Sequence, residues 1–117
     1  MDIYYKTSID AAHLLPNVPK GHKCGRLHGH TYRITIWCSG AVNPATGWVI
    51  DYYEIKDAFQ PLHDLLDHRY LNEIPGLENS TVENLAVFIW DRLKGAIPVS
   101  GIEIKETCTA GCFYKGE

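Results

Sequence analysis

The sequence predicts an α+β protein in which two helices cover one face of an antiparallel sheet. A strictly alternating stretch over residues 28–38 predicts a long strand, and two later stretches repeat apolar residues at helical spacing. The expected order of elements is strand, strand, helix, helix, strand, strand, without an internal repeat or linker. At 117 residues, the chain is expected to form one domain over residues 1–117.

The first two expected strands flank a turn-rich loop. Residues 3–12 are rich in Tyr, Ile and Thr, which favours a strand that delivers His13 at its end. Residues 14–26 contain two prolines and two glycines, so we expect a loop there. The second strand places every other residue on one face, namely His28, His30, Tyr32, Ile34, Ile36 and Cys38.

Two helices are expected in the middle of the chain. Asp51 can cap the first, which has apolar residues at helical spacing up to about residue 66. Pro61 lies inside this pattern and lacks an amide donor, so it is expected to kink or divide the helix. Residues 80–83 read Ser-Thr-Val-Glu, a capping box that predicts the start of the second helix.

The last two strands form the end of the predicted fold. Ile102 and Ile104 alternate with polar residues, and Glu106 continues their apolar face. Residues 109–111 are expected to turn the chain into a short final strand at residues 112–114. A carboxylate on an apolar strand face needs a partner, so Glu106 is a candidate functional residue.

Composition excludes several classes of function. The formal net charge is −3, and no basic face or tail supports nucleic-acid binding. No apolar run approaches the ~18 residues of a membrane-spanning helix, and residues 1–6 lack the basic and apolar regions of a signal peptide. We therefore expect a cytoplasmic protein that binds neither nucleic acid nor membranes, with its cysteines as free thiols.

Three histidines predict a metal site. His28 and His30 are spaced i, i+2, which points both rings to the same face of a strand. His13, from a separate strand, can supply a third imidazole. Three nitrogen ligands leave one tetrahedral position open, which is typical of catalytic zinc. Zinc is the expected metal, because imidazole ligands suit it in a site without redox chemistry.

Cys24 lies four residues before His28, in a segment that also contains basic residues. Neighbouring cations favour a thiolate, which can act as a base or a nucleophile. Spacing alone supports equally well a fourth zinc ligand in a closed structural site, or an inert thiol. Lys20, Lys23 and Arg26 can bind phosphate, although most short basic clusters are only solvated.

Two further groups carry possible chemistry. Asp67 and His68 are adjacent, so the carboxylate can orient and charge the imidazole for proton transfer. The alternative is an aspartate at a helix end beside a surface histidine. Glu106 can bind an amidine-like pair of N–H groups through two parallel hydrogen bonds. The alternative is an edge-strand glutamate whose carboxylate lies in water.

The motifs that contain these residues resemble the 6-pyruvoyltetrahydropterin synthase family over essentially the whole chain. The resemblance is strongest in two segments, residues 21–30 and 105–112, which look like the bacterial 6-carboxytetrahydropterin synthase branch of queuosine biosynthesis. The other matching motifs are Ala-Ala-His at 11–13, Leu-Asp-His-x-x-Leu-Asn at 66–72 and Thr-x-Glu-Asn at 81–84. Two positions depart from the usual pattern, because Ile9 replaces a Phe and Ser80 replaces a Pro.

The resemblance implies a tunnelling fold, in which the sheets of several subunits join into a barrel, usually a hexamer of two trimers. It also implies that His13, His28 and His30 bind zinc and that Cys24 is the catalytic base. Asp67 and His68 would form a proton relay that meets the cysteine across a subunit interface. Glu106 would anchor the pterin ring and would also count among the catalytic residues.

The activity implied by the resemblance is conversion of 7,8-dihydroneopterin triphosphate to 6-carboxy-5,6,7,8-tetrahydropterin, with loss of acetaldehyde and triphosphate. The closest rival is 6-pyruvoyltetrahydropterin synthesis from the same substrate, which keeps all side-chain carbons. A rival from another class is a non-catalytic, zinc-stabilised pterin-binding module. The residues alone do not separate the two products.

Overall fold

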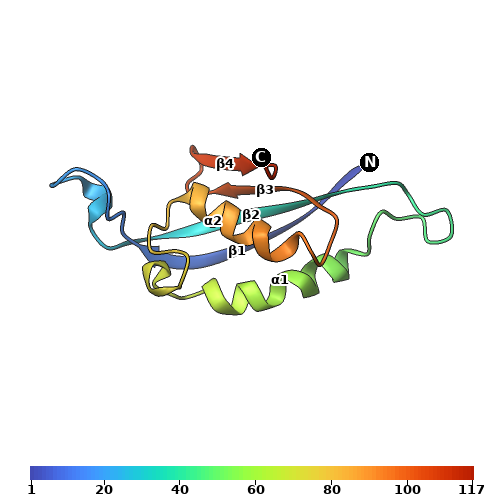
Figure 1. Ribbon diagram of the computed structural model, residues 1–117, viewed down its shortest axis with the longest axis horizontal. Coiled ribbons are helices and arrows are strands. Elements are labelled where there is room, and N and C mark those ends of the chain that lie inside the picture. The colour runs from blue at the N-terminus through green and yellow to red at the C-terminus, as the bar shows by residue number, and fades with distance from the viewer.

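The computed structural model describes all residues from 1 to 117 (Figure 1). The first two strands of the chain are followed by two helices and then by two further strands, as expected. The elements are β1 (Asp2–His13), β2 (His28–Ser39), α1 (Tyr52–Leu66), α2 (Val82–Leu93), β3 (Val99–Lys105) and β4 (Gly111–Tyr114), with short 3-10 turns at Lys23–Gly25 and Leu71–Glu73.

All four strands form one antiparallel sheet in the order β1-β2-β3-β4. The predicted α+β class is therefore confirmed. β1 and β2 pair over their whole length, from Asp2 opposite Ser39 to His13 opposite His28. This pairing brings the end of β1 next to the start of β2, so both ends of the loop between them lie at one end of the sheet.

Both helices pack on the same face of the sheet (Figure 1). Apolar residues of β2 and β3 alternate with polar ones, which turns one face of the sheet toward the helices. The buried cluster between these layers includes Ile34, Ile36, Ile102 and Ile104 of the sheet, Ile55, Phe59, Leu62 and Leu66 of α1, and Leu85, Ile89 and Leu93 of α2. The histidines of β2 lie on this core-facing side.

Pro61 does not divide α1, contrary to one of the outcomes expected for it. The helix continues from Tyr52 to Leu66 through the proline, and Asp51 caps it by accepting from the amide of Tyr53 at 2.9 Å. Pro61 and Asp57, four residues earlier, are both exposed. Water can therefore satisfy the carbonyl that loses its helical donor.

The capping residue of α2 lies one position later than the sequence indicated. Thr81, not Ser80, is the N-cap, because its hydroxyl accepts from the amide of Asn84 at 3.1 Å. Ser80 is fully buried, and its hydroxyl donates to the side chain of Asn72 at 3.0 Å. A hydrogen bond to a residue eight positions earlier thus engages the residue that the local pattern assigned to the cap.

The molecule is elongated, with principal extents of 57 × 24 × 23 Å. Two loops project from opposite ends of the sheet, one between β1 and β2 and the other between β2 and α1 (Figure 1). Neither helix has the length and the apolar character that crossing a membrane requires. The site described next lies at the end of the sheet that carries the first of these loops.

Candidate metal centre

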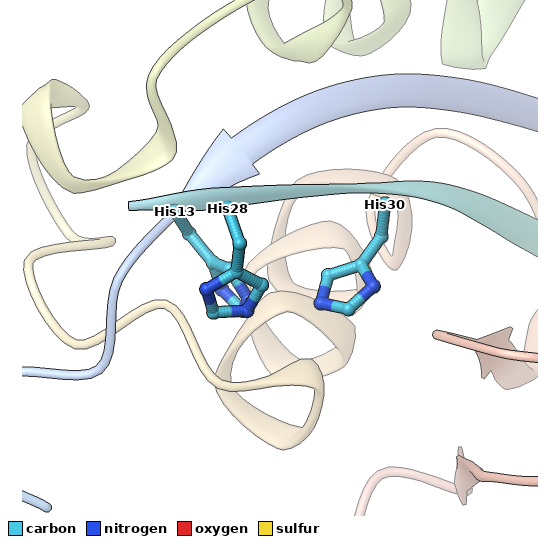
Figure 2. Close-up of side chains that lie close together, drawn as sticks. All are labelled: His13, His28 and His30. Atoms are coloured by element: carbon cyan, nitrogen blue, oxygen red, sulfur yellow. The ribbon is translucent and has the colours of Figure 1, made fainter. Parts of the chain in front are cut away.

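Three imidazoles converge at one end of the sheet. His13 is the last residue of β1, whereas His28 and His30 stand near the start of β2. Figure 2 shows the rings of His28 and His30 projecting from the same side of β2, with the ring of His13 beside that of His28. The register explains this arrangement, because His13 pairs with His28 and Ala11 pairs with His30.

Two of the rings are oriented by backbone carbonyls. Nδ1–H of His13 donates to the carbonyl of Ser80 at 2.7 Å, and Nδ1–H of His28 donates to the carbonyl of Arg26 at 2.7 Å. A carbonyl only accepts, so each bond places the proton of the neutral ring on Nδ1 and leaves a lone pair on Nε2. Sequence reasoning missed both carbonyls, because backbone groups leave no signal in side-chain motifs.

The lone pairs of these two rings face each other. Nε2 of His13 lies 3.0 Å from Nε2 of His28, and this approach is favourable only when a cation or a proton lies between the two nitrogens. Two nitrogens bound to one tetrahedral zinc at 2.0–2.1 Å would lie roughly 3.3 Å apart. The ligand atoms of His13, His28 and His30 all lie within 4.8 Å of one another. The three imidazoles therefore fit a metal ion.

The carboxylate of Glu106 faces the same group. Its Oε1 lies 3.4 Å from Nε2 of His30 and 3.6 Å from Nε2 of His13. Nε2 of His30 is buried and has no hydrogen-bond partner. The expected strand included Glu106, but β3 ends at Lys105, so Glu106 follows directly after the strand; its side chain is one quarter exposed. The carboxylate can therefore contact either the bound metal or a ligand at this end of the sheet.

Burial favours the neutral form of two of the imidazoles. Desolvation is the largest influence on the pKa of His13, and it lowers this pKa below the ordinary value of 6.5. The pKa of His30 is lowered for the same reason, with the negative charge of Glu106 opposing the shift. A neutral imidazole is the form that binds metal, so the surroundings favour ligation at neutral pH.

Tyr32 forms the wall of the site on the core side. Its ring is fully buried and lies edge-on to those of His13 and His30, at centroid distances of 5.9 and 5.4 Å. Burial raises the pKa of its hydroxyl, which has no hydrogen-bond partner within the chain. The wall is thus apolar apart from one neutral hydroxyl.

The Asp67–His68 pair lies beside β1, and its two members are in contact. Nδ1–H of His68 donates to Oδ2 of Asp67 at 2.9 Å, and Oδ1 of Asp67 accepts from the amide of Asp10 at 2.9 Å. The backbone of His68 has a φ of 58°, which is uncommon outside glycine, and its amide donates to the carbonyl of Asp10 at 2.6 Å. Asp67 is the C-cap residue of α1, but its side chain binds β1 and His68.

The two members of this pair shift each other's pKa. The pKa of Asp67 is lowered, first by the hydrogen bond from the Asp10 amide and then by the one from His68. The pKa of His68 is raised by its hydrogen bond to the Asp67 carboxylate. His68 and His30 line the same open hollow of about 590 Å³ on the end of the sheet. The pair therefore lies near the metal centre without contacting it.

Cys24 lies apart from these groups within the chain. It belongs to the short turn Lys23–Gly25 in the projecting loop, and its thiol makes no hydrogen bond. The group of side chains able to hold a metal comprises the three histidines, so Cys24 lies outside it. The closed site with a fourth thiolate ligand, one of the alternatives left open by spacing, does not form in this structure.

The sheet, its helical layer and the converging imidazoles define an α+β protein with a candidate three-histidine metal centre. The sequence model of the family described as 6-pyruvoyl tetrahydropterin synthase matches residues 2–117. The chain belongs to this family, which confirms the resemblance seen in its motifs.

Several known proteins are similar to the chain. A 6-carboxy-5,6,7,8-tetrahydropterin synthase of Synechocystis sp. is 38% identical over 96% of this chain and 91% of its own length. A 6-pyruvoyl tetrahydrobiopterin synthase of Homo sapiens is 35% identical over 77% of this chain and 67% of its own length. The solved structure of Caenorhabditis elegans 6-pyruvoyl tetrahydropterin synthase superposes with a TM-score of 0.92 at 27% identity, and the match covers 100% of this chain and 96% of that one.

These relatives are named as synthases of pterins, which supports an enzyme of the same broad kind. The match to the solved structure covers the whole chain, so it also supports the fold as a whole. Family membership alone does not choose between the carboxy and the pyruvoyl product, because relatives of both names match the chain.

Proposed function

We propose that this protein is a zinc-dependent carbon–carbon lyase acting through a single catalytic domain over residues 1–117. Its substrates would be 7,8-dihydroneopterin triphosphate and one water molecule, and its products 6-carboxy-5,6,7,8-tetrahydropterin, acetaldehyde and triphosphate. This reaction would supply the queuosine precursor pathway in the cytoplasm. The observation that carries the proposal is the convergence of three imidazoles in a chain that is 38% identical to a 6-carboxytetrahydropterin synthase over nearly its whole length.

His13, His28 and His30 would hold the zinc ion. The carbonyl-bound Nδ1 atoms of His13 and His28 present Nε2 for ligation, and the buried, unpartnered Nε2 of His30 completes the set. Three protein ligands leave one position for a substrate oxygen. Bound zinc would supply Lewis acidity to the side-chain hydroxyls of the substrate.

Cys24 would act as the catalytic base. A thiolate can remove a proton from the side-chain carbon or hydroxyl of the substrate. The thiol is partly exposed and lies on a projecting loop rather than in the metal ligand group. This position leaves it free for proton transfer, which a metal-bound thiolate would not be.

Asp67 and His68 would form the second proton-transfer group. The Asp67 carboxylate accepts from Nδ1–H of His68, which leaves Nε2 of the ring to take up or release a proton. The raised pKa of His68 favours the protonated ring, so the pair can donate a proton as bonds in the substrate rearrange.

Glu106 would anchor the pterin ring. Its carboxylate lies beside the metal ligands and is only one quarter exposed, so a ring bound there would place its side chain near the zinc position. Two parallel hydrogen bonds from ring N–H groups to the carboxylate oxygens would orient the substrate.

The sheet edges support assembly into a homo-oligomer. β1 has twelve residues at one edge, and the segment after α1 covers only its end, through bonds at Asp10 and Ala12. The outward backbone groups of Tyr4, Lys6 and Ser8 have no partner in the chain. An open edge of this length is a template for another strand. We propose a hexamer of two trimers with active sites at subunit interfaces, where Cys24 and the Asp67–His68 pair would meet.

Incubation of the zinc-loaded protein with 7,8-dihydroneopterin triphosphate tests the proposal directly. Mass analysis is expected to show the 6-carboxy product, and acetaldehyde is expected in an equal amount. A pterin that keeps all its side-chain carbons would instead identify the 6-pyruvoyl synthase activity. Recovery of unchanged substrate from zinc-loaded protein would contradict both activities and favour the non-catalytic binding module.

A further inference from the structure

The side chain of Asn72 joins two segments that meet at the metal centre. Its Oδ1 accepts from the amide of Leu14 at 3.1 Å and from the hydroxyl of Ser80 at 3.0 Å. Its Nδ2 donates to the carbonyls of Leu14 at 2.8 Å and Glu78 at 3.1 Å. The side-chain amide of Asn72 therefore links the residue after His13 with the segment that contains Glu78 and Ser80.

These bonds surround the contact that orients His13. The carbonyl that accepts from Nδ1–H of His13 belongs to Ser80, and both residues are fully buried. His13 and Ser80 are 67 positions apart, so local backbone geometry does not hold them together. Asn72 binds the carbonyl of Leu14, the immediate neighbour of His13, and the hydroxyl of Ser80.

His28 provides an internal comparison. Its orienting carbonyl belongs to Arg26, only two positions away, so the turn before β2 suffices to hold it. The corresponding contact of His13 spans two distant segments and needs a tertiary link. Asn72 is the side chain that makes this link on both sides.

We propose that Asn72 is a positioning residue for the metal ligand His13. By holding the Ser80 carbonyl against Nδ1 of His13, it keeps the proton on Nδ1 and directs the lone pair of Nε2 toward His28. Without this restraint, the Ser80 segment can move away, and the buried ring is then free to rotate or to carry its proton on Nε2. Groups that orient a ligating imidazole in this way typically change metal affinity 10–100-fold when they are removed.

The test is the zinc affinity of Asn72→Ala, measured by competition with a chromophoric chelator, together with the ring ¹⁵N shifts of His13 in the metal-free protein. Zinc affinity is expected to fall about tenfold or more. The ¹⁵N shifts are expected to lose the pattern of a ring protonated on Nδ1. Asn72→Leu keeps roughly the volume of the side chain but has neither the acceptor oxygen nor the donors, so the same direction is expected if Asn72→Ala does not fold.

The matched control is Asn84→Ala. Asn84 also donates from its side-chain amide to a carbonyl of this loop, that of Asn79 at 2.8 Å, but its side chain makes no hydrogen bond to Ser80 or to the end of β1. It is expected to keep both the zinc affinity and the His13 signature. An equal loss in this control, or a folded Asn72 variant with zinc affinity within twofold of the wild type and an unchanged His13 ring, would overturn the inference.

The inference rests on the proposed metal function, and the two can fail separately. Wild-type protein that binds no zinc would contradict the proposed function. In that case, the ¹⁵N signature of metal-free His13 still decides whether Asn72 positions this ring. A wild type that binds zinc and Asn72 variants that bind it equally well would contradict only the role of Asn72.

Discussion

The imidazole group and the Asp67–His68 pair lie near each other but are held in opposite ways. His13 is fully buried, whereas the side chain of His68 is 78% exposed. Carbonyls within the chain orient two of the three clustered rings, whereas His68 is oriented by one partly exposed carboxylate. The comparison teaches that one chain by itself preorganises three imidazoles that could bind a metal, whereas the proposed proton transfer would depend on groups that still have to cover His68.

Electrostatics divides the two regions in the same way. Burial lowers the pKa of His13 and His30, which favours the neutral form that ligates a metal. The Asp67 carboxylate raises the pKa of His68, which favours the charged form that donates a proton. The surroundings therefore shift the pKa of one residue type in opposite directions, as the two proposed chemistries would require.

Removal of one metal ligand is expected to have the largest effect. His30→Ala leaves two imidazoles, and we expect zinc affinity to fall roughly 100-fold or more and lyase activity to be lost with the metal. Chelator competition and acetaldehyde release measure the two effects. His63→Ala removes a histidine of α1 outside the metal group and is the matched control. Zinc affinity in His30→Ala equal to that of the control would show that the three rings do not form the site.

Substitution of Cys24 is expected to separate catalysis from metal binding. Cys24→Ala should lower kcat roughly 100-fold or more, which is the usual scale of a lost general base, while zinc content stays that of the wild type. Cys108→Ser, which alters an exposed thiol on the β3–β4 turn, is the control for thiol chemistry. Loss of zinc from Cys24→Ala would instead support the alternative in which Cys24 is the fourth ligand of a closed structural zinc site. Unchanged kcat with retained zinc would contradict a catalytic role for Cys24.

Asp67→Asn is expected to have the smallest effect on the metal and a specific effect on His68. The pKa of His68 should fall toward 6.5, because its largest cause of elevation is the hydrogen bond to Asp67. NMR titration of the His68 ring measures this shift. Zinc affinity should stay unchanged, because no metal ligand contacts Asp67. A parallel loss of zinc affinity would show that the two regions are coupled within the chain.

The same pair gives a pH dependence with a defined sign. The pKa of His68 is raised in the folded state, so this residue contributes stability that is present below pH 6.5. That contribution is lost as the pH rises through the pKa of His68 in the folded protein. The lowered pKa of Asp67 contributes stability above 3.8 that is lost as the pH falls through its folded value. Both contributions should disappear in Asp67→Asn, and denaturant unfolding across this pH range would show it.

Much of the fold could be predicted from local pattern. The alternation along β2 identified the core-facing side, and the helical spacing located α1 and α2 within a few residues. The errors arose where tertiary contacts replaced local rules. Ser80 is drawn into a bond with Asn72, so Thr81 caps α2 instead. Pro61 is exposed, so water can replace the hydrogen-bond donor that proline lacks, and α1 continues.

The sequence by itself indicated the three imidazoles and the common face of His28 and His30, because side chains alternate regularly along a strand. It also contained the Asp67–His68 pair as neighbours. Only the tertiary structure decided how these groups are held. The Ser80 carbonyl reaches His13 across 67 positions, and Asp67 reaches the backbone of Asp10 across 57. Such contacts depend on the packing of whole elements, whose relative positions no local spacing records.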